Sequence, residues 1–276
     1  MARLSSSKVG VYLLMTALVT VLMAVQASCP SYAAAQPARA GSAVPRVDGR
    51  VALASVMALS DAYLQKVADS LKTLADTDEA RTADWEKIRG LLDQTARRNV
   101  PAVAWFALPD GTYWTVEQGR VAQTLADRPY FKRLLAGDTV IGDLVVSRST
   151  GKCVAVVAVP IVRDRSVVGA LGSSVYLDRL SGLINKEMAL DKSMIFYSFD
   201  AQPLVALVWD PQLVFLEPMK QENESLKRAF GEMVSKNEGT VTYEYRGRTR
   251  TVIYRKSPVT KWWYAFGIVR GGREVQ

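Results

Sequence analysis

The stretch KCVAVVAVPIVRDRSVVGALGSSVY, residues 152–176, decides the fold. Residues 152–162 form an almost uninterrupted apolar run with the length of a buried strand. A polar turn over 163–166 follows, and residues 167–176 return as a second strand. The sequence therefore predicts a long antiparallel hairpin, around which the other elements are arranged.

Helical and extended patterns alternate on both sides of this hairpin. Before it, the predicted elements are helices over 51–75, 85–98 and 127–137 and strands over 100–108, 112–116 and 141–146. After it, they are helices over 177–188 and 219–236 and strands over 193–199, 204–209, 239–245, 250–255 and 262–269. The same plan thus occurs twice behind one long helix. We predict an α+β fold of two units, each an antiparallel sheet with flanking helices.

The N-terminus has the pattern of an export signal. Arg3 and Lys8 precede an apolar run over 9–25 without a single charge, and three alanines at 33–35 provide a cleavage site. One alternative is an uncleaved membrane anchor, since the run is near the lower limit of roughly 17 residues for a spanning helix. Another is a lipoprotein acylated at Cys29. All three place the rest of the chain outside the cytoplasm, in the periplasm after cleavage.

Composition favours a binding protein over an enzyme. The chain of 276 residues has a formal charge of +8, two cysteines and no histidine. Catalytic Ser-His-Asp and Cys-His pairs, imidazole metal sites and thiolate zinc sites are therefore excluded, and we expect no metal or other cofactor. The charge suits an anionic ligand or a membrane surface, but it is too diffuse to indicate nucleic acid. Cys153, inside the apolar run, is interpreted as a buried small hydrophobe.

A second stretch, DRPYFKRLLAG at 127–137, places a cation and two aromatic residues at a helix start. One interpretation is that Arg128 presents its guanidinium to a ligand carboxylate and Tyr130 adds a hydroxyl and a ring face. The alternative is local: Asp127 caps the helix, Pro129 begins its first turn, and the arginine pairs with a nearby acid. We favour ligand binding for the arginine and local packing for the proline and the apolar residues.

Other candidate binding residues lie on the predicted strands and the loops between them. Trp105 and Trp114 are candidates for the wall of the same cavity, with core packing as the alternative. Tyr113 sits on the predicted hairpin and can add a hydroxyl. Ser147 and Ser149 precede the central strands and can donate to a ligand or serve only the turn.

Five motifs together carry a family resemblance. They are Asp127–Phe131 with Gly137, Ser149–Gly151 before 156–160, Val167–Gly172, Gly239–Tyr243 and Lys261–Tyr264. In this order, over about residues 47–270, the chain resembles the double Cache domain, the extracytoplasmic PAS-like sensor module of bacterial chemoreceptors and sensor kinases. The sequence pattern predicts a signal peptide at 1–35, and the Ala-, Pro- and Arg-rich composition predicts a disordered leader at 36–46. A long helical entry segment follows at 47–99. The resemblance implies a membrane-distal ligand-binding module at 100–190 and a membrane-proximal module at 191–270, followed by a tail at 271–276.

The resemblance also implies a ligand class. A subgroup of the family binds amino acids through an arginine that Arg128 matches, whereas Gln123 replaces a tyrosine of that motif. Ser174, or its neighbour Ser173, falls where the subgroup has an aspartate for the ligand amine. Without that carboxylate a bound ammonium would be unpaired, which favours an organic acid or another small anion. The expected ligand-binding residues are Arg128, Tyr130, Trp105, Tyr113, Ser147 and Ser174.

The basic residues of the second unit have two interpretations. Arg246, Arg248, Arg250, Arg255, Lys256 and Lys261 belong either to a solvated hairpin or to a surface that contacts anionic lipid headgroups. The chain ends at Gln276 without a second apolar span. We therefore expect it to act with a membrane receptor or kinase, or with a second copy paired through the long N-terminal helix.

These observations predict an exported small-molecule-binding sensor protein that acts in signal transduction or chemotaxis. Its expected ligand is a small organic acid or another small anion. The alternative is an interaction or assembly module whose pocket has degenerated and is filled. An enzyme has the least support, because the sequence shows neither a nucleophile elbow nor an acid pair that can be placed together.

Overall fold

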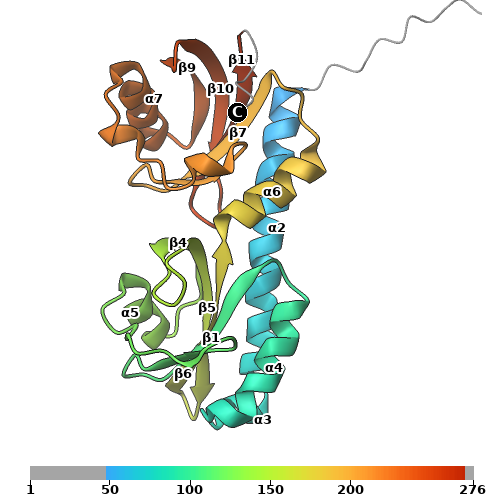
Figure 1. The fold of residues 1–276 in the computed structure, drawn as a ribbon, viewed down its shortest axis with the longest axis vertical. Coiled ribbons are helices and arrows are strands. Elements are labelled where there is room, and N and C mark those ends of the chain that lie inside the picture. Colours follow the sequence, from blue (N-terminus) through green and yellow to red (C-terminus); the bar gives the residue numbers. More distant parts are fainter. Residues whose placement is uncertain (1–47, 271–276) are drawn as a thin grey trace, which may run out of the picture. The chain divides into compact units, whose positions relative to one another are not determined.

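One long helix runs past both sheets of the protein (Figure 1). The computed structural model describes residues 48–270, and this helix, α2 (Gly49–Ala75), begins at the start of that range. Asp48 caps it, because its carboxylate accepts a hydrogen bond from the backbone N–H of Arg50 at 2.8 Å. Buried residues recur along α2 at helical spacing, so one face packs against the core along its length. The helix predicted over 51–75 is confirmed.

Some predictions concern residues beyond this range. The signal peptide, leader and tail predicted at 1–35, 36–46 and 271–276, and the acylation of Cys29, lie outside the described residues. Between residues 48 and 270, no helix is both long enough and apolar enough to span a bilayer.

The first sheet contains the predicted central hairpin. Its six strands lie in the order β3-β2-β1-β6-β5-β4, and neighbouring strands are antiparallel. The strands are β1 (Ala102–Ala107), β2 (Tyr113–Thr115), β3 (Gly119–Arg120), β4 (Val140–Val146), β5 (Cys153–Arg163) and β6 (Ser166–Tyr176). β5 and β6 pair along almost their whole length, from Val154 opposite Tyr176 to Arg163 opposite Ser166.

The second sheet has five antiparallel strands in the order β8-β7-β11-β10-β9. These are β7 (Met194–Phe199), β8 (Val205–Val208), β9 (Glu238–Tyr245), β10 (Arg248–Lys256) and β11 (Trp263–Val269). The remaining helices are α3 (Asp78–Arg81), α4 (Trp85–Arg97), α5 (Pro129–Leu135), α6 (Leu177–Met188) and α7 (Glu224–Ser235). The predicted α+β class, with a long N-terminal helix and two antiparallel sheets, is confirmed.

Apolar cores hold these layers together. The largest lies between α2 and the two sheets, and it includes Leu171 of the first sheet and Phe196 of the second. A second core lies under α5 on the opposite face of the first sheet. A third lies under α7 on the opposite face of the second sheet (Figure 1). Each sheet therefore has α2 on one face and a helix of its own on the other.

The loop between β10 and β11 contacts both α2 and the first sheet. Trp262, which is 1% exposed, donates its indole N–H to the carbonyl of Gly142 at 2.9 Å. Gly142 lies at a bulge in β4 with a φ of +93°, a conformation that favours glycine. Ser257 donates to the carboxylate of Asp61 on α2 at 2.7 Å. These contacts join the two sheets through a few buried polar groups.

The last helix begins later than predicted. The sequence pattern predicts a helix from residue 219, but α7 begins at Glu224. Asn223 caps it, because its side-chain oxygen accepts from the backbone N–H of Leu226 at 2.8 Å. Pro218–Lys220 forms a separate 3₁₀ turn before this cap, and Gln221 after it has an extended backbone (φ −76°, ψ 146°), which separates the turn from α7.

Candidate ligand-binding site

Three aromatic residues form the wall of the candidate site, on the face of the first sheet that α5 covers. Trp105 of β1, Tyr113 of β2 and Tyr130 of α5 belong to the same apolar core. The rings of Trp105 and Tyr130 have centroids 6.5 Å apart. All three residues are buried, so little free space lies between the rings. The structure thus brings together three of the six predicted residues as a closely packed wall.

Arg128, at the N-cap of α5, has incomplete hydrogen bonding. Its Nη2 donates to the carbonyl of Val146 at 2.8 Å. Its Nε is buried and has no hydrogen-bond partner among the described residues. A buried guanidinium N–H without an acceptor carries a desolvation cost that a bound anion would remove. Arg128 therefore offers an unmatched donor at the border of the aromatic wall.

Tyrosine and serine hydroxyls lie around this guanidinium. Burial raises the pKa of Tyr130, although the charge of Arg128 opposes the rise. Burial likewise raises the pKa of Tyr113, against the charges of two arginines. Both phenols therefore stay protonated at neutral pH and can donate to a ligand oxygen. Ser147 is buried, and its Oγ lies 3.2 Å from the Oγ of Ser149, which is itself a hydrogen-bond partner of Tyr113.

Ser174 holds the ring of Trp105 in place. The indole Nε1 donates to the Oγ of Ser174 at 3.1 Å. Gly172 lies directly opposite Trp105 on β6, and any side chain there would overlap the indole. Ser174 therefore has a positioning contact within the protein, and its own hydroxyl hydrogen remains free to donate.

Arg148 is a residue that the sequence analysis did not single out. Its Nη1 and Nη2 bind the two carboxylate oxygens of Asp127 at 2.6 and 2.7 Å, and Nη1 also donates to the carbonyl of Thr124. The predicted capping role of Asp127 is wrong, because this arginine takes its carboxylate and α5 has no side-chain cap. The position of Arg148 between Ser147 and Ser149, both named as candidates, was the available signal.

Replacing Arg148 with glutamine should raise the pKa of Asp127, which the hydrogen-bonded guanidinium holds at about 2, toward its ordinary value of 3.8. The folded-state pKa lies below the unfolded one. The contribution of this pair to stability is therefore present above about pH 4 and is lost as the pH falls toward about 2. An NMR titration of the side-chain carboxyl in both proteins measures the shift. An unchanged pKa would contradict the pairing.

The two carboxylate side chains beside the site both form ion pairs with arginines. Asp127 binds Arg148, and Asp143 binds Arg133 of α5. Among residues 48–270, no carboxylate is within ion-pair distance of Arg128. The site therefore combines an unpaired cation with hydroxyl donors, and its acids are already neutralised. This arrangement suits a ligand with a carboxylate and without an ammonium group.

For Trp114 the core-packing alternative is confirmed, whereas the interpretation of Cys153 is wrong in detail. Trp114 faces away from the site, because alternation along β2 turns it to the opposite face of the sheet from Tyr113. There it stacks on Trp85 and Phe106, with centroid distances of 6.3 and 5.8 Å. Cys153 is a free cysteine of intermediate exposure rather than a fully buried one, because it lies at the end of β5.

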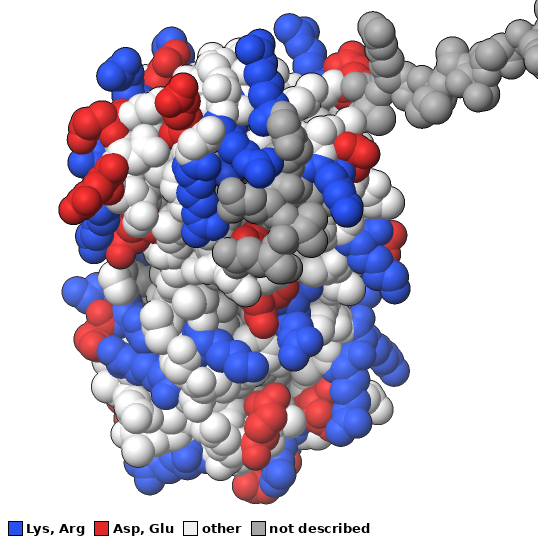
Figure 2. All heavy atoms as spheres, turned by 45° about the horizontal axis from the view of Figure 1, so that its top comes forward, with Lys and Arg blue, Asp and Glu red and all other residues white. Residues whose placement is uncertain are grey.

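The basic residues of the second unit do not form a single solvated surface. Arg250 is buried, at 8% exposure, whereas Arg246, Arg255 and Lys261 are exposed. On the face drawn in Figure 2, lysine and arginine side chains are spread out with acidic ones between them. The interpretation of Arg250 as part of a solvated hairpin is therefore wrong.

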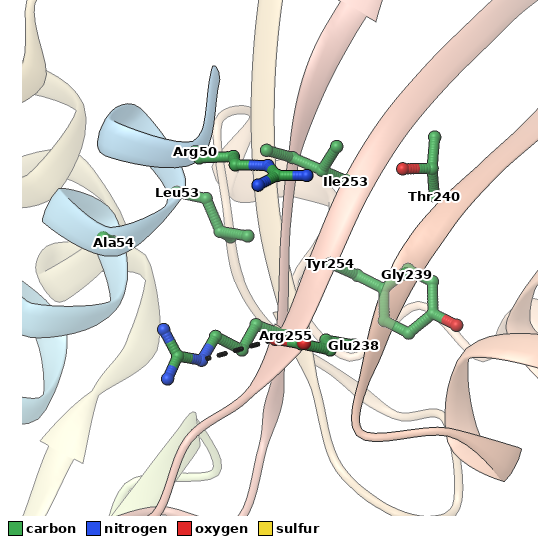
Figure 3. A pocket seen from close by; sticks show the side chains of 9 residues that line it. All are labelled: Arg50, Leu53, Ala54, Glu238, Gly239, Thr240, Ile253, Tyr254 and Arg255. Atoms are coloured by element: carbon green, nitrogen blue, oxygen red, sulfur yellow. Dashed lines mark ion pairs between the residues drawn. The ribbon is translucent and has the colours of Figure 1, made fainter. Parts of the chain in front are cut away.

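A hollow of about 420 Å³ lies between the first turns of α2 and strands β9 and β10 (Figure 3). Arg50 and Leu53 line it on the helix side. On the strand side, the Nε of Arg255 lies 3.9 Å from a carboxylate oxygen of Glu238. Tyr254 directs its hydroxyl away from the helix (Figure 3). Because its charged groups are exposed and partly paired, this hollow has weaker ligand-binding features than the surroundings of Arg128.

Comparison with known proteins finds the same fold in solved sensor domains. The ligand-binding domain of the Campylobacter jejuni chemoreceptor Tlp3, in complex with L-norvaline, is 12% identical with a TM-score of 0.60, over 80% of this chain and 89% of that one. The ligand-binding domain of the Pseudomonas aeruginosa chemoreceptor PctB, in complex with L-Arg, is 16% identical with a TM-score of 0.59, over 81% and 92%.

The extracellular domain of rpHK1S-Z16, a protein named as a histidine kinase, is 15% identical with a TM-score of 0.65, over 79% and 92%. No protein-family model matches the sequence, and no curated protein matches it significantly. At these identities the similarity concerns the fold. It confirms the architecture of extracytoplasmic sensor domains that the double Cache resemblance implied.

Proposed function

We propose that the chain is an extracytoplasmic sensor protein that binds a small carboxylate at Arg128. The observation that carries the proposal is the buried Nε of this arginine, which has no acceptor among the described residues. Its Nη2 is held by the carbonyl of Val146, so the guanidinium is already oriented. A carboxylate can bind such a fork with two parallel hydrogen bonds. The hydroxyls of Tyr130, Tyr113 and Ser147 and the ring of Trp105 complete the site.

The surrounding charges favour an acid without an amino group. The solved domains named above contain amino acids, whose carboxylates would need the same kind of cation. Ser174 supplies a hydroxyl where an ammonium would need a charge, and the nearby carboxylates of Asp127 and Asp143 bind arginines. A buried ammonium without a carboxylate is unfavourable by several kcal/mol in order of magnitude. We therefore assign a small organic acid as the ligand.

The similarity of the fold to extracytoplasmic sensor domains supports the rest of the proposal. The module at 100–190 binds the ligand, and the module at 191–270 lies nearer the membrane. The chain acts outside the cytoplasm, with a membrane receptor or kinase as its partner, in signal transduction or chemotaxis. It binds its ligand without converting it, and pairing of two copies through α2 is part of the same proposal.

Replacing Arg128 with glutamine is expected to abolish ligand-induced stabilisation. A ligand at 100 times its Kd adds about 2.7 kcal/mol to the stability of the wild type, which is a rise in Tm of several degrees. A thermal-shift screen with mono- and dicarboxylates, amino acids, amines and sugars measures this. Arg120→Gln is the matched control, because Arg120 is an exposed arginine of the same sheet.

The outcomes separate the alternatives. A carboxylate that stabilises the wild type and Arg120→Gln but not Arg128→Gln supports both the function and the site. If every carboxylate that stabilises the wild type stabilises Arg128→Gln equally, the proposed site lies elsewhere. Stabilisation by amino acids alone would overturn the assignment of the ligand class. A folded protein that responds to nothing in the screen would favour the assembly module with a filled pocket.

A further inference from the structure

The second sheet contains a buried arginine with the same deficiency as Arg128. Arg250 of β10 is 8% exposed, and its Nε is buried without a hydrogen-bond partner. Among residues 48–270, four buried side-chain polar atoms lack a partner, and two of them are the Nε atoms of these arginines. No acid of the described residues forms an ion pair with Arg250. A buried cation without a counter-charge is strongly unfavourable.

Strand alternation explains why Arg250 is inside. Side chains along a strand point to opposite faces in turn, so Arg250 shares its face with Val252 and Tyr254, both buried. That face belongs to the core under α7. The guanidinium carbon lies 4.8 Å from the centroid of the Tyr245 ring. This cation–π contact compensates part of the desolvation of the charge and leaves the Nε donor unmatched.

A narrow cavity adjoins this guanidinium. It is lined by apolar and aromatic side chains, with hydroxyls as its other polar groups. Its lining includes Tyr197, Trp209, Leu213, Phe230, Tyr243 and Arg250. Its free volume is about 30 Å³, roughly the share of one water molecule in the liquid. The hydroxyls of Tyr243 and Tyr197 are 3.1 Å apart inside it.

The segment that covers the cavity carries backbone strain. Trp209, Leu213 and Leu216 of this segment line the cavity. Between them, Phe215 has a φ of +63°, which is unfavourable for a bulky side chain. The cavity as it stands has room for about one water molecule, so binding of a short organic acid requires this segment to move outward. Because the lining is apolar, we expect the uncharged part of the ligand to be apolar as well.

We infer that the second module has its own ligand site, in which Arg250 binds the carboxylate of a short monocarboxylic acid with an apolar tail. The carboxylate supplies the missing acceptor for Nε. The phenol of Tyr243, which donates to Tyr197, lies beside the guanidinium. The tail occupies the space between Trp209, Leu213 and Phe230. This site is separate from Arg128 and does not depend on the function proposed for the first module.

The test compares propionate with propionamide, which has the same size and no charge. Sodium propionate at a hundredfold excess over its Kd should raise Tm by roughly 5 °C, and propionamide or sodium chloride should not. The shift should persist in Arg128→Gln, which distinguishes this site from the first one. It should also persist in Arg255→Met, the matched control, because Arg255 is exposed on the same strand.

Arg250→Met keeps an unbranched apolar side chain and removes the charged guanidinium. Calorimetry should show a loss of affinity for propionate of roughly ten- to a hundredfold, the effect of one charge-assisted hydrogen-bond pair. Arg250→Gln, which also removes the charge, provides the same comparison if the methionine variant does not fold. The inference is overturned if propionate leaves the wild type unchanged, if propionamide acts equally well, or if the position 250 variants bind propionate like the wild type.

Discussion

Replacing Trp262 with alanine should destabilise the protein by about 3–5 kcal/mol, the range for deleting a buried aromatic side chain. Trp262 is 1% exposed and belongs to the core that both sheets share. Its ring contacts Tyr264, with centroids 6.3 Å apart, and its indole N–H is bonded to Gly142. The substitution therefore leaves a cavity and an unmatched carbonyl at the junction of the two sheets.

Urea unfolding followed by circular dichroism measures this loss. Ile268→Ala is the control, because Ile268 lies on the neighbouring strand β11 and is 55% exposed. Its expected effect is within about 0.5 kcal/mol. A loss for Trp262→Ala no larger than that of the control would mean that the junction contributes little to stability.

Replacing Gly172 with alanine should cost about 3 kcal/mol or more and should also abolish ligand binding at Arg128. The new methyl group would overlap the indole of Trp105, and both residues lie on neighbouring strands in the middle of the sheet. The ring must turn away, which breaks its hydrogen bond to Ser174 and displaces the aromatic wall. The effect on binding distinguishes this position from a glycine that is important for folding alone.

Gly90→Ala in α4 is the matched control for this substitution. No atom lies within 4 Å of the methyl group that it would add, and alanine is favoured over glycine inside helices by about 0.5–1 kcal/mol. Equilibrium unfolding and the thermal-shift screen are applied to both variants. If Gly172→Ala is as stable as the wild type, the strand has room for the methyl group and the account of the Trp105 ring is wrong.

Long apolar runs made most of the fold predictable. The hairpin of β5 and β6 has two runs of strand length joined by a polar turn, and α2 shows helical spacing over seven turns. Such patterns reflect burial directly, so they predict element type without knowledge of the partners. The beginning of α7 was less predictable, because a proline turn and an asparagine cap interrupt a region with apolar spacing.

The site was predictable only where local sequence carries the signal. Arg128 could be named because it precedes a proline at a helix start. Its missing acceptor could not be seen, since this depends on how Arg148, 21 residues after Asp127, takes the carboxylate. Arg250 was predictable in part: it alternates in step with Val252 and Tyr254, which indicates a buried face. The high local density of arginines hid that pattern.

The 27 residues of α2 give the helix a length of about 40 Å at 1.5 Å per residue. One end packs beside the first sheet, and the other packs beside the second. A tilt of about 3° at one end of a rod of that length displaces the other end by about 2 Å. A tilt imposed on α2 at one module would therefore displace residues beside the other module, so the helix is a direct geometric connection between the two modules.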